Sequence, residues 1–425
     1  MKTTKRTLNT LLLTTAFSLV TGVQSLMAAD YGIRAFYGDK LSGRVVVMDV
    51  DSMSFIDDIY TQGIYPYPVD QAGNLDKVYA ITRGSNSIDV INATTLEPMG
   101  LIDLAHYPRS SEAYNESLGL QLVTGVDKPM ASLIDVESDK VVASVGLNEL
   151  FSVEDYGGSN ATGHPFWFND NMFALIDRPN RTIHLYMVKK VKTRHGIKVK
   201  TKLLDSVPTP TAVHHFVKRK SISKGMDSRI YYALSEGAPE AGISPSILKY
   251  ILTPKNKLKL YAETALSDEN IELMGSHHAD MHPDGIHMYI GSTEGNLYVL
   301  NTDTMEIVTK IAVGQGAGHT TFVPDRHLAI VTNHKDTFIT IINTDTHTAI
   351  KNVTVSGPQV NGAILQSHSS FVHPNMNFFY AFASDNGIFY ELNLETLEVS
   401  RTVETGGTPL QGVFMCQGAD CENLM

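Results

Sequence analysis

The segment Leu297–Val313 reads LYVLNTDTMEIVTKIAV, and the segment Ile339–Val355 reads ITIINTDTHTAIKNVTV. In both, apolar and polar residues alternate on each side of an NTDT sequence. Alternation with a period of two predicts β-strands, and Asn, Asp and Thr between two such runs predict a tight turn. The two segments therefore predict two copies of one hairpin repeat.

The same hairpin pattern occurs eight times along the chain, and a further short strand pattern precedes most copies. Repeats of roughly 40–50 residues that contain four short strands are typical of β-propellers. We therefore predict an all-β fold, a single β-propeller domain over residues 30–425, with eight blades. Seven blades are the alternative if one copy is wrongly assigned. The other six copies are Val45–Ile59, Ile88–Leu104, Ala131–Leu147, Ile183–Val207, Ile247–Leu266 and Phe389–Val403.

The two ends of the chain carry incomplete repeats. The first hairpin has no clear strand before it, and the last strand pattern, Leu410–Cys416, has no hairpin after it. We expect the N- and C-terminal strands to share one blade, because this closes the ring and leaves no sheet edge unpaired. The hairpin segments resemble those of the YVTN-type repeat propellers over nearly the whole mature chain. That resemblance implies the fold, but not a function.

Residues 1–29 have the pattern of an export signal. Lys2, Lys5 and Arg6 precede an apolar run over residues 11–23, and Ala28-Ala29 offers small residues for cleavage. No later apolar run is long enough to span a membrane. We therefore expect a periplasmic protein. In that oxidising compartment the two cysteines, Cys416 and Cys421, are expected to form a local disulfide, with metal ligation by one of them as the alternative.

The charge of the chain argues against two classes of partner. The formal net charge is −11, and removal of the three cations of residues 1–29 would leave −14. Nucleic acids and anionic membranes attract basic surfaces. We therefore expect neither nucleic-acid binding nor membrane insertion.

Histidines gather at one position of the repeat. In five consecutive units, a histidine stands at or beside the start of the expected innermost strand. The innermost strands of a propeller surround its central channel, so these imidazoles should meet at one end of that channel. Packing does not require histidine there, and clustered imidazoles would repel one another if protonated. The residues are His164, His214, His215, His277, His278, His319 and His368.

Such a cluster predicts a metal site, because neutral imidazole is a common ligand of copper, zinc and iron. Seven candidates are more than one ion uses, which favours a multinuclear centre. The pattern resembles the histidine-lined propellers of nitrous-oxide reductase and thiocyanate dehydrogenase, and that resemblance implies copper and oxidoreductase activity. Those families have seven blades, and nitrous-oxide reductase adds a cupredoxin domain that this chain lacks. Zinc is the alternative metal.

Loops at the same end of the channel supply further candidates. We expect His334, Asp177 and Glu236 to act as catalytic groups, with His334 as acid, base or further ligand and the carboxylates orienting ligand imidazoles. Arg83 and Lys335 are expected to face the substrate.

Three functions remain open at this point. The first is a copper oxidoreductase that acts on a small inorganic or sulfur/nitrogen compound and passes electrons to an external cytochrome or cupredoxin. The second is a zinc or copper metallochaperone or storage protein. The third is an interaction scaffold without metal. The number and type of bound metal ions would separate them.

Overall fold

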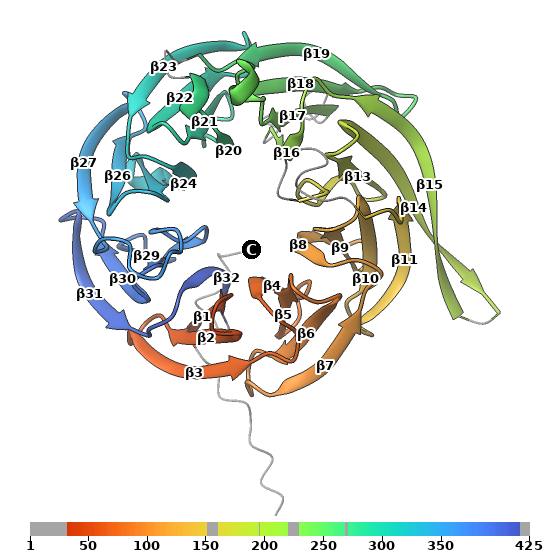
Figure 1. Ribbon diagram of the computed structural model, residues 1–425, viewed down its shortest axis with the longest axis horizontal. Coiled ribbons are helices and arrows are strands. Elements are labelled where there is room, and N and C mark those ends of the chain that lie inside the picture. Colours follow the sequence, from red (N-terminus) through yellow and green to blue (C-terminus); the bar gives the residue numbers. More distant parts are fainter. Residues whose placement is uncertain (1–31, 151–159, 195, 220–228, 268–270, 417–425) are drawn as a thin grey trace, which may run out of the picture.

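The computed structural model describes residues 32–150, 160–194, 196–219, 229–267 and 271–416. Within this part of the chain, eight four-stranded antiparallel sheets form a ring around a central opening (Figure 1). The predicted all-β propeller with eight blades is therefore confirmed. The predicted export signal, residues 1–29, lies outside the described residues.

The blades follow one another along the chain, and the first strand given for each is the innermost. Blade 1 consists of β32 (Pro409–Cys416), β1 (Ile33–Asp39), β2 (Arg44–Asp49) and β3 (Ser54–Tyr60). Blade 2 consists of β4 (Pro66–Gln71), β5 (Lys77–Thr82), β6 (Ser87–Asn92) and β7 (Pro98–Asp103). Blade 3 consists of β8 (Pro108–Asn115), β9 (Leu120–Gly125), β10 (Met130–Asp135) and β11 (Lys140–Gly146). Blade 4 consists of β12 (Phe166–Asn169), β13 (Met172–Asp177), β14 (Thr182–Thr193) and β15 (Gly196–Pro208).

The second half of the ring repeats this order. Blade 5 consists of β16 (Val213–Lys218), β17 (Ile230–Ser235), β18 (Ser246–Leu252) and β19 (Leu258–Ala265). Blade 6 consists of β20 (Ser276–Met281), β21 (His287–Ser292), β22 (Asn296–Asn301) and β23 (Glu306–Ala312). Blade 7 consists of β24 (Ala317–Val323), β25 (Leu328–Asn333), β26 (Phe338–Asn343) and β27 (Thr348–Thr354). Blade 8 consists of β28 (Ser370–Val372), β29 (Phe378–Ala383), β30 (Ile388–Asn393) and β31 (Glu398–Glu404). Short 3-10 helices occur at η2 (Pro239–Ala241), η3 (Ile271–Leu273) and η4 (Pro324–Arg326).

The outer hairpins form because their turn residues satisfy the backbone locally. In blade 6 the side-chain oxygen of Asn301 accepts hydrogen bonds from the backbone N–H groups of Asp303 and Thr304, at 2.9 and 3.2 Å. Met305 then takes a left-handed φ of 59°. This turn brings Asn301 opposite Glu306, and the register of β22 and β23 shifts further along the strands, between Val299 and Leu300. Asn343 and His347 play the same parts in blade 7.

The hydrophobic core lies between the blades. The buried apolar side chains of the described residues form eight clusters, and each cluster joins two neighbouring blades. Between blades 1 and 2, for example, Phe36 and Val45 pack with Val69 and Val78. Alternation in each strand supplies apolar side chains to both faces of a blade, so the ring is held by sheet-on-sheet packing and the channel is left free for polar residues.

The two ends of the chain close the ring as expected. β32 pairs with β1 in an antiparallel register that runs from Ile33 opposite Cys416 to Asp39 opposite Pro409. Cys416 is part of a disulfide; Cys421, its predicted partner, lies outside the described residues. The described part of the chain contains no helix long and apolar enough to cross a membrane.

Candidate metal centre

The inner strands are irregular where the histidines stand. In blade 6, Ser276 pairs with Ser292 and Ala279 with Ile290, so two residues of β20, including His278, oppose one residue of β21. In blade 7 the same bulge contains His319. A bulge turns side chains away from the regular alternation of a strand. Strict alternation would place these imidazoles on the face of the blade. The bulges direct them into the channel instead.

Bulges at this position are not restricted to the blades with histidine. In blade 5 the extra residue of β16 is His214, in blade 3 the first extra residue of β8 is Arg109, and in blade 2 the bulge of β4 contains Tyr67 and Pro68. The channel is thus lined at one level by bulge residues from several blades.

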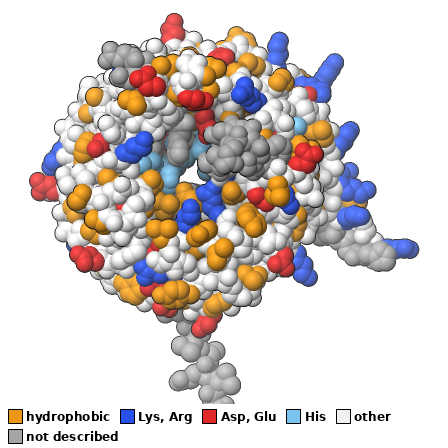
Figure 2. Space-filling model, viewed as in Figure 1, with side chains coloured by type: hydrophobic (Ala, Val, Ile, Leu, Met, Phe, Trp, Pro, Cys, Tyr) orange, Lys and Arg blue, Asp and Glu red, His pale blue; other side chains and the backbone are white. Residues whose placement is uncertain are grey.

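Seven imidazoles meet at this level of the channel. From one ring to its neighbour, the centroid separations run from 3.3 to 5.6 Å along a continuous cluster. Figure 2 shows histidine side chains gathered in the central opening. We call this set the channel cluster, and its members come from five consecutive blades: His164, His214, His215, His278, His319, His334 and His368.

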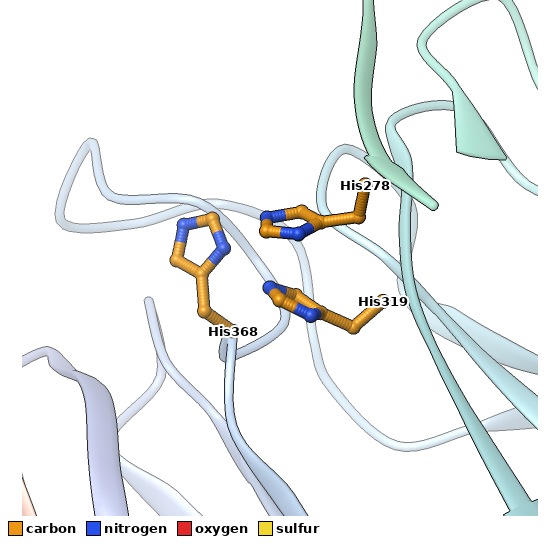
Figure 3. A group of neighbouring side chains, drawn as sticks. All are labelled: His278, His319 and His368. Carbon is orange, nitrogen blue, oxygen red and sulfur yellow. The ribbon is translucent and has the colours of Figure 1, made fainter. Parts of the chain in front are cut away.

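Three members of the channel cluster form a compact candidate metal site. His278, His319 and His368 each offer one nitrogen, and these nitrogens all lie within 4.8 Å of one another. Figure 3 shows the three rings turned toward one another. A tetrahedral ion with metal–nitrogen bonds of about 2.0 Å needs ligand nitrogens about 3.3 Å apart. Small side-chain rotations would therefore bring all three onto one ion.

The other members lie on both sides of this group. His334 is 4.4 Å from His368 between ring centroids, and its Nδ1–H donates to the carbonyl oxygen of Gln366 at 2.9 Å. That hydrogen bond fixes the tautomer and leaves Nε2 as the nitrogen with a lone pair. His334 thus suits the role of a further ligand better than that of a proton donor.

The remaining three imidazoles form a second group beside His278. The rings of His164 and His214 are 4.9 Å apart, and that of His215 lies 5.4 Å from His278. The Nδ1 of His214 donates to Glu236 at 2.7 Å, and the Nδ1 of His164 donates to Glu112. Carboxylates that hold the Nδ1 proton in this way are typical of metal-binding histidines, because they leave Nε2 directed at the ion.

One buried nitrogen of the cluster suits a metal ligand. Nδ1 of His215 is buried and has no hydrogen-bond partner among the described residues. A buried polar atom without a partner costs roughly 1–3 kcal/mol. A metal ion at this position would remove that cost.

The surroundings keep three of these imidazoles neutral, which metal binding requires. Burial lowers the pKa of His334 to about 4. Burial and the neighbouring His164 lower the pKa of His215 to about 3. Burial, together with Arg109, Arg83 and Arg178, holds the pKa of His164 well below its usual value. At neutral pH these nitrogens therefore carry lone pairs.

Three cavities give access to the channel cluster. One of about 450 Å³ contacts His164, His214, His278 and His368 at the end of the channel where Arg83 lies. Cavities of about 550 and 580 Å³ lie along the later residues of the inner strands and contact His278, His319 and His368 from the other side. The cluster thus forms a layer across the channel that small molecules can reach.

Known proteins resemble this chain in fold only. No family model and no curated protein matches the sequence. The dihydro-heme d1 dehydrogenase NirN, in complex with DHE, shares 12% identity, with a TM-score of 0.64 over 92% of this chain and 76% of that one. Apo AztD from Citrobacter koseri shares 11%, with a TM-score of 0.58 over 91% and 98% of the two chains. The periplasmic gluconolactonase PpgL of Pseudomonas aeruginosa shares 12%, with a TM-score of 0.54 over 77% and 97%. At this identity the likeness shows the propeller and no activity.

Of the other residues predicted for the site, some lie at the channel cluster and others do not. Glu236 contacts His214, as an orienting carboxylate should, and Arg83 lines the cavity of about 450 Å³. Asp177 is not brought to the cluster, because its carboxylate accepts hydrogen bonds from Asn180 and lies 3.5 Å from His184. Lys335 is also outside, since it is exposed and lines none of the three cavities. The side chain of His277 lies outside the described residues.

The sequence prediction missed several residues around the cluster. Arg109, Lys40 and Tyr67 line the same cavity as Arg83, and Glu112 holds His164. Arg109 could have been predicted from its position in the repeat. It stands in the bulge of blade 3, and histidines stand in the equivalent bulges of blades 5, 6 and 7. Lys40 lies in a loop between strands, and nothing in the repeat marks it.

Proposed function

We propose that the protein is a periplasmic copper oxidoreductase with a multinuclear centre in the propeller channel. The observation that carries the proposal is the channel cluster of seven imidazoles from five blades. A single zinc ion takes three or four protein ligands, so this cluster exceeds what one ion uses. An all-imidazole ligand set suits copper, which also changes its oxidation state.

The chemistry follows from where the cluster lies. Copper held by the histidines would bind and polarise a small inorganic or sulfur/nitrogen compound that enters through the cavity of about 450 Å³. Bound copper would supply one-electron redox chemistry, and an external carrier such as a cytochrome or a cupredoxin would accept the electrons of the substrate. Glu236 and Glu112 would hold the imidazoles of His214 and His164 in the ligating tautomer.

A metal carrier is the second candidate, and one observation favours it. His278 and His368 each line cavities on both sides of the cluster. A single ion held by His278, His319 and His368 would therefore be open to exchange without unfolding. Zinc suits such a three-histidine site as well as copper does.

Elemental analysis of the protein purified from the periplasm tests both candidates. Two or more copper ions per chain with a visible absorption band support the oxidoreductase. One exchangeable zinc or copper ion supports the carrier. No bound metal after expression and after reconstitution with either ion overturns both.

A further inference from the structure

Basic side chains gather above the channel cluster. Lys40, Arg83 and Arg109 line the cavity of about 450 Å³ whose floor is formed by histidines. Arg178 lies beside this cavity and donates to Glu236 and to the carbonyl oxygen of Asn160. Figure 2 shows basic side chains next to the histidines in the central opening. This concentration of cations contrasts with the acidic net charge of the chain.

The partners of the two innermost guanidinium groups are neutral. Arg83 donates to the side-chain oxygen of Asn160 and lies over the ring of Tyr67, at 5.1 Å from its centroid. Arg109 is 4% exposed and donates to the carbonyl oxygen of Thr162. Among the described residues, neither group forms an ion pair with a carboxylate.

Buried cations that form no ion pair cost free energy. Burial, Arg178 and Arg83 lower the pKa of Arg109 to about 9 and outweigh the opposite effect of Glu236, which lines the same cavity, and of Glu112. Burial together with Arg83 lowers the pKa of Lys40. At neutral pH, Arg109 still carries its charge. An anion in the cavity would offset this mutual repulsion, and a planar guanidinium is well suited to bind oxyanions with two hydrogen bonds.

We propose that this cavity is an anion site formed by Lys40, Arg83 and Arg109, and that the compound which reaches the metal is a small inorganic anion. The second half of this statement rests on the proposed function, whereas the first half does not. The anion would lie between the cations and the imidazoles of His164 and His214, which line the same cavity.

Calorimetric titration of the metal-free protein tests the anion site. We expect sodium thiosulfate and sodium nitrite to bind, and neutral acetamide not to bind. Arg83→Gln and Arg109→Gln should each weaken anion binding at least tenfold, while Arg326→Gln, which removes a guanidinium bonded to Met376 and Asn377 away from the channel, should not. Equal anion binding by all variants, or no anion binding by the wild type, would overturn the proposal.

Metal content separates this proposal from the function proposed above. The two arginine variants should keep the copper content of the wild type, because neither side chain is a metal ligand. A protein that binds the anions but holds no metal would refute the oxidoreductase and leave the anion site in place. A protein that holds copper but binds no anion would refute the anion site and leave the oxidoreductase proposal in place.

Discussion

The imidazole rings of His278 and His319 come from neighbouring blades, and their centroids lie 3.3 Å apart. Rings bonded to one tetrahedral ion are about 5 Å apart. Metal binding should therefore separate these two rings by about 2 Å, or place them on different ions. Crystal structures of the metal-free and the copper-loaded protein would measure this change. Rings that stay at the present separation in the loaded protein would show that His278 and His319 do not share one ion.

Loss of the three central imidazoles should remove metal but keep the fold. A variant with His278, His319 and His368 changed to alanine loses the compact site, whereas the eight interblade clusters contain none of these residues. We expect copper per chain to fall at least tenfold, with an unchanged far-ultraviolet circular dichroism spectrum. His327→Ala is the control, since that ring lies outside the cluster. Full copper content in the triple variant would contradict the assignment of the site.

The bulge in blade 7 gives a way to disturb the site without removing a ligand. A Cβ atom on Gly318 would lie 2.1 Å from Nε2 of His334, so Gly318→Ala must displace that ring. We expect weaker metal binding and a loss of about 1–3 kcal/mol in the free energy of unfolding. Gly357→Ala is the matched control, because its Cβ meets no atom closer than 3.7 Å. Metal titration and urea denaturation would measure both effects, and equal affinities of the two variants would place His334 outside the metal site.

The fold could be predicted because its signal is repeated. Each outer hairpin combines alternating residues with an Asn or Asp turn, and eight copies at similar spacing leave few architectures open. The incomplete repeats at both ends predicted the shared blade, which β32 and β1 form. The gathering of histidines was also predictable, because one position of a repeat maps to one level of the channel.

What the sequence did not show depends on irregular backbone and on loops. Alternation alone cannot show that His278 and His319 stand in bulges, and the bulges decide that both face the channel. Asp177 and Lys335 were predicted to face the site from loops, but Asp177 ends β13 and accepts hydrogen bonds from Asn180, and Lys335 is an exposed turn residue. Arg109 was missed because only histidine was sought at its position.

Closure of the ring should depend on one buried carboxylate. Asp39 is fully buried, accepts hydrogen bonds from Arg44 at 3.2 Å and Thr408 at 3.0 Å, and so ties β1 to the segment before β32. Asp39→Ala removes these hydrogen bonds but leaves Arg44 paired with Asp58, so it should cost about 1.5–3 kcal/mol. Urea denaturation would measure this loss. Asp345→Ala, which removes an exposed ion pair with His327, should cost less than about 1 kcal/mol. Equal losses in both variants would show that the blade closes without Asp39.

The stability of the protein should fall with rising pH because of Asp70. Burial and the neighbouring Glu112 raise the pKa of this carboxyl to about 7, although Ser111 donates two hydrogen bonds to it. In the unfolded chain its pKa is about 3.9. Between these values the folded protein holds a proton that the unfolded chain has released, so the free energy of unfolding decreases as pH rises from about 4 to about 7.

Asp70→Asn should remove this dependence, because an amide oxygen can still accept from Ser111 but carries no charge. We expect the variant to be more stable than the wild type at pH 8, on the order of 3 kcal/mol, and the difference to disappear near pH 4. Urea denaturation at several pH values would measure it, with Asp345→Asn, an exposed carboxylate, as the control. A difference that stays constant from pH 4 to pH 8 would mean that Asp70 is ionised in the folded protein throughout that range.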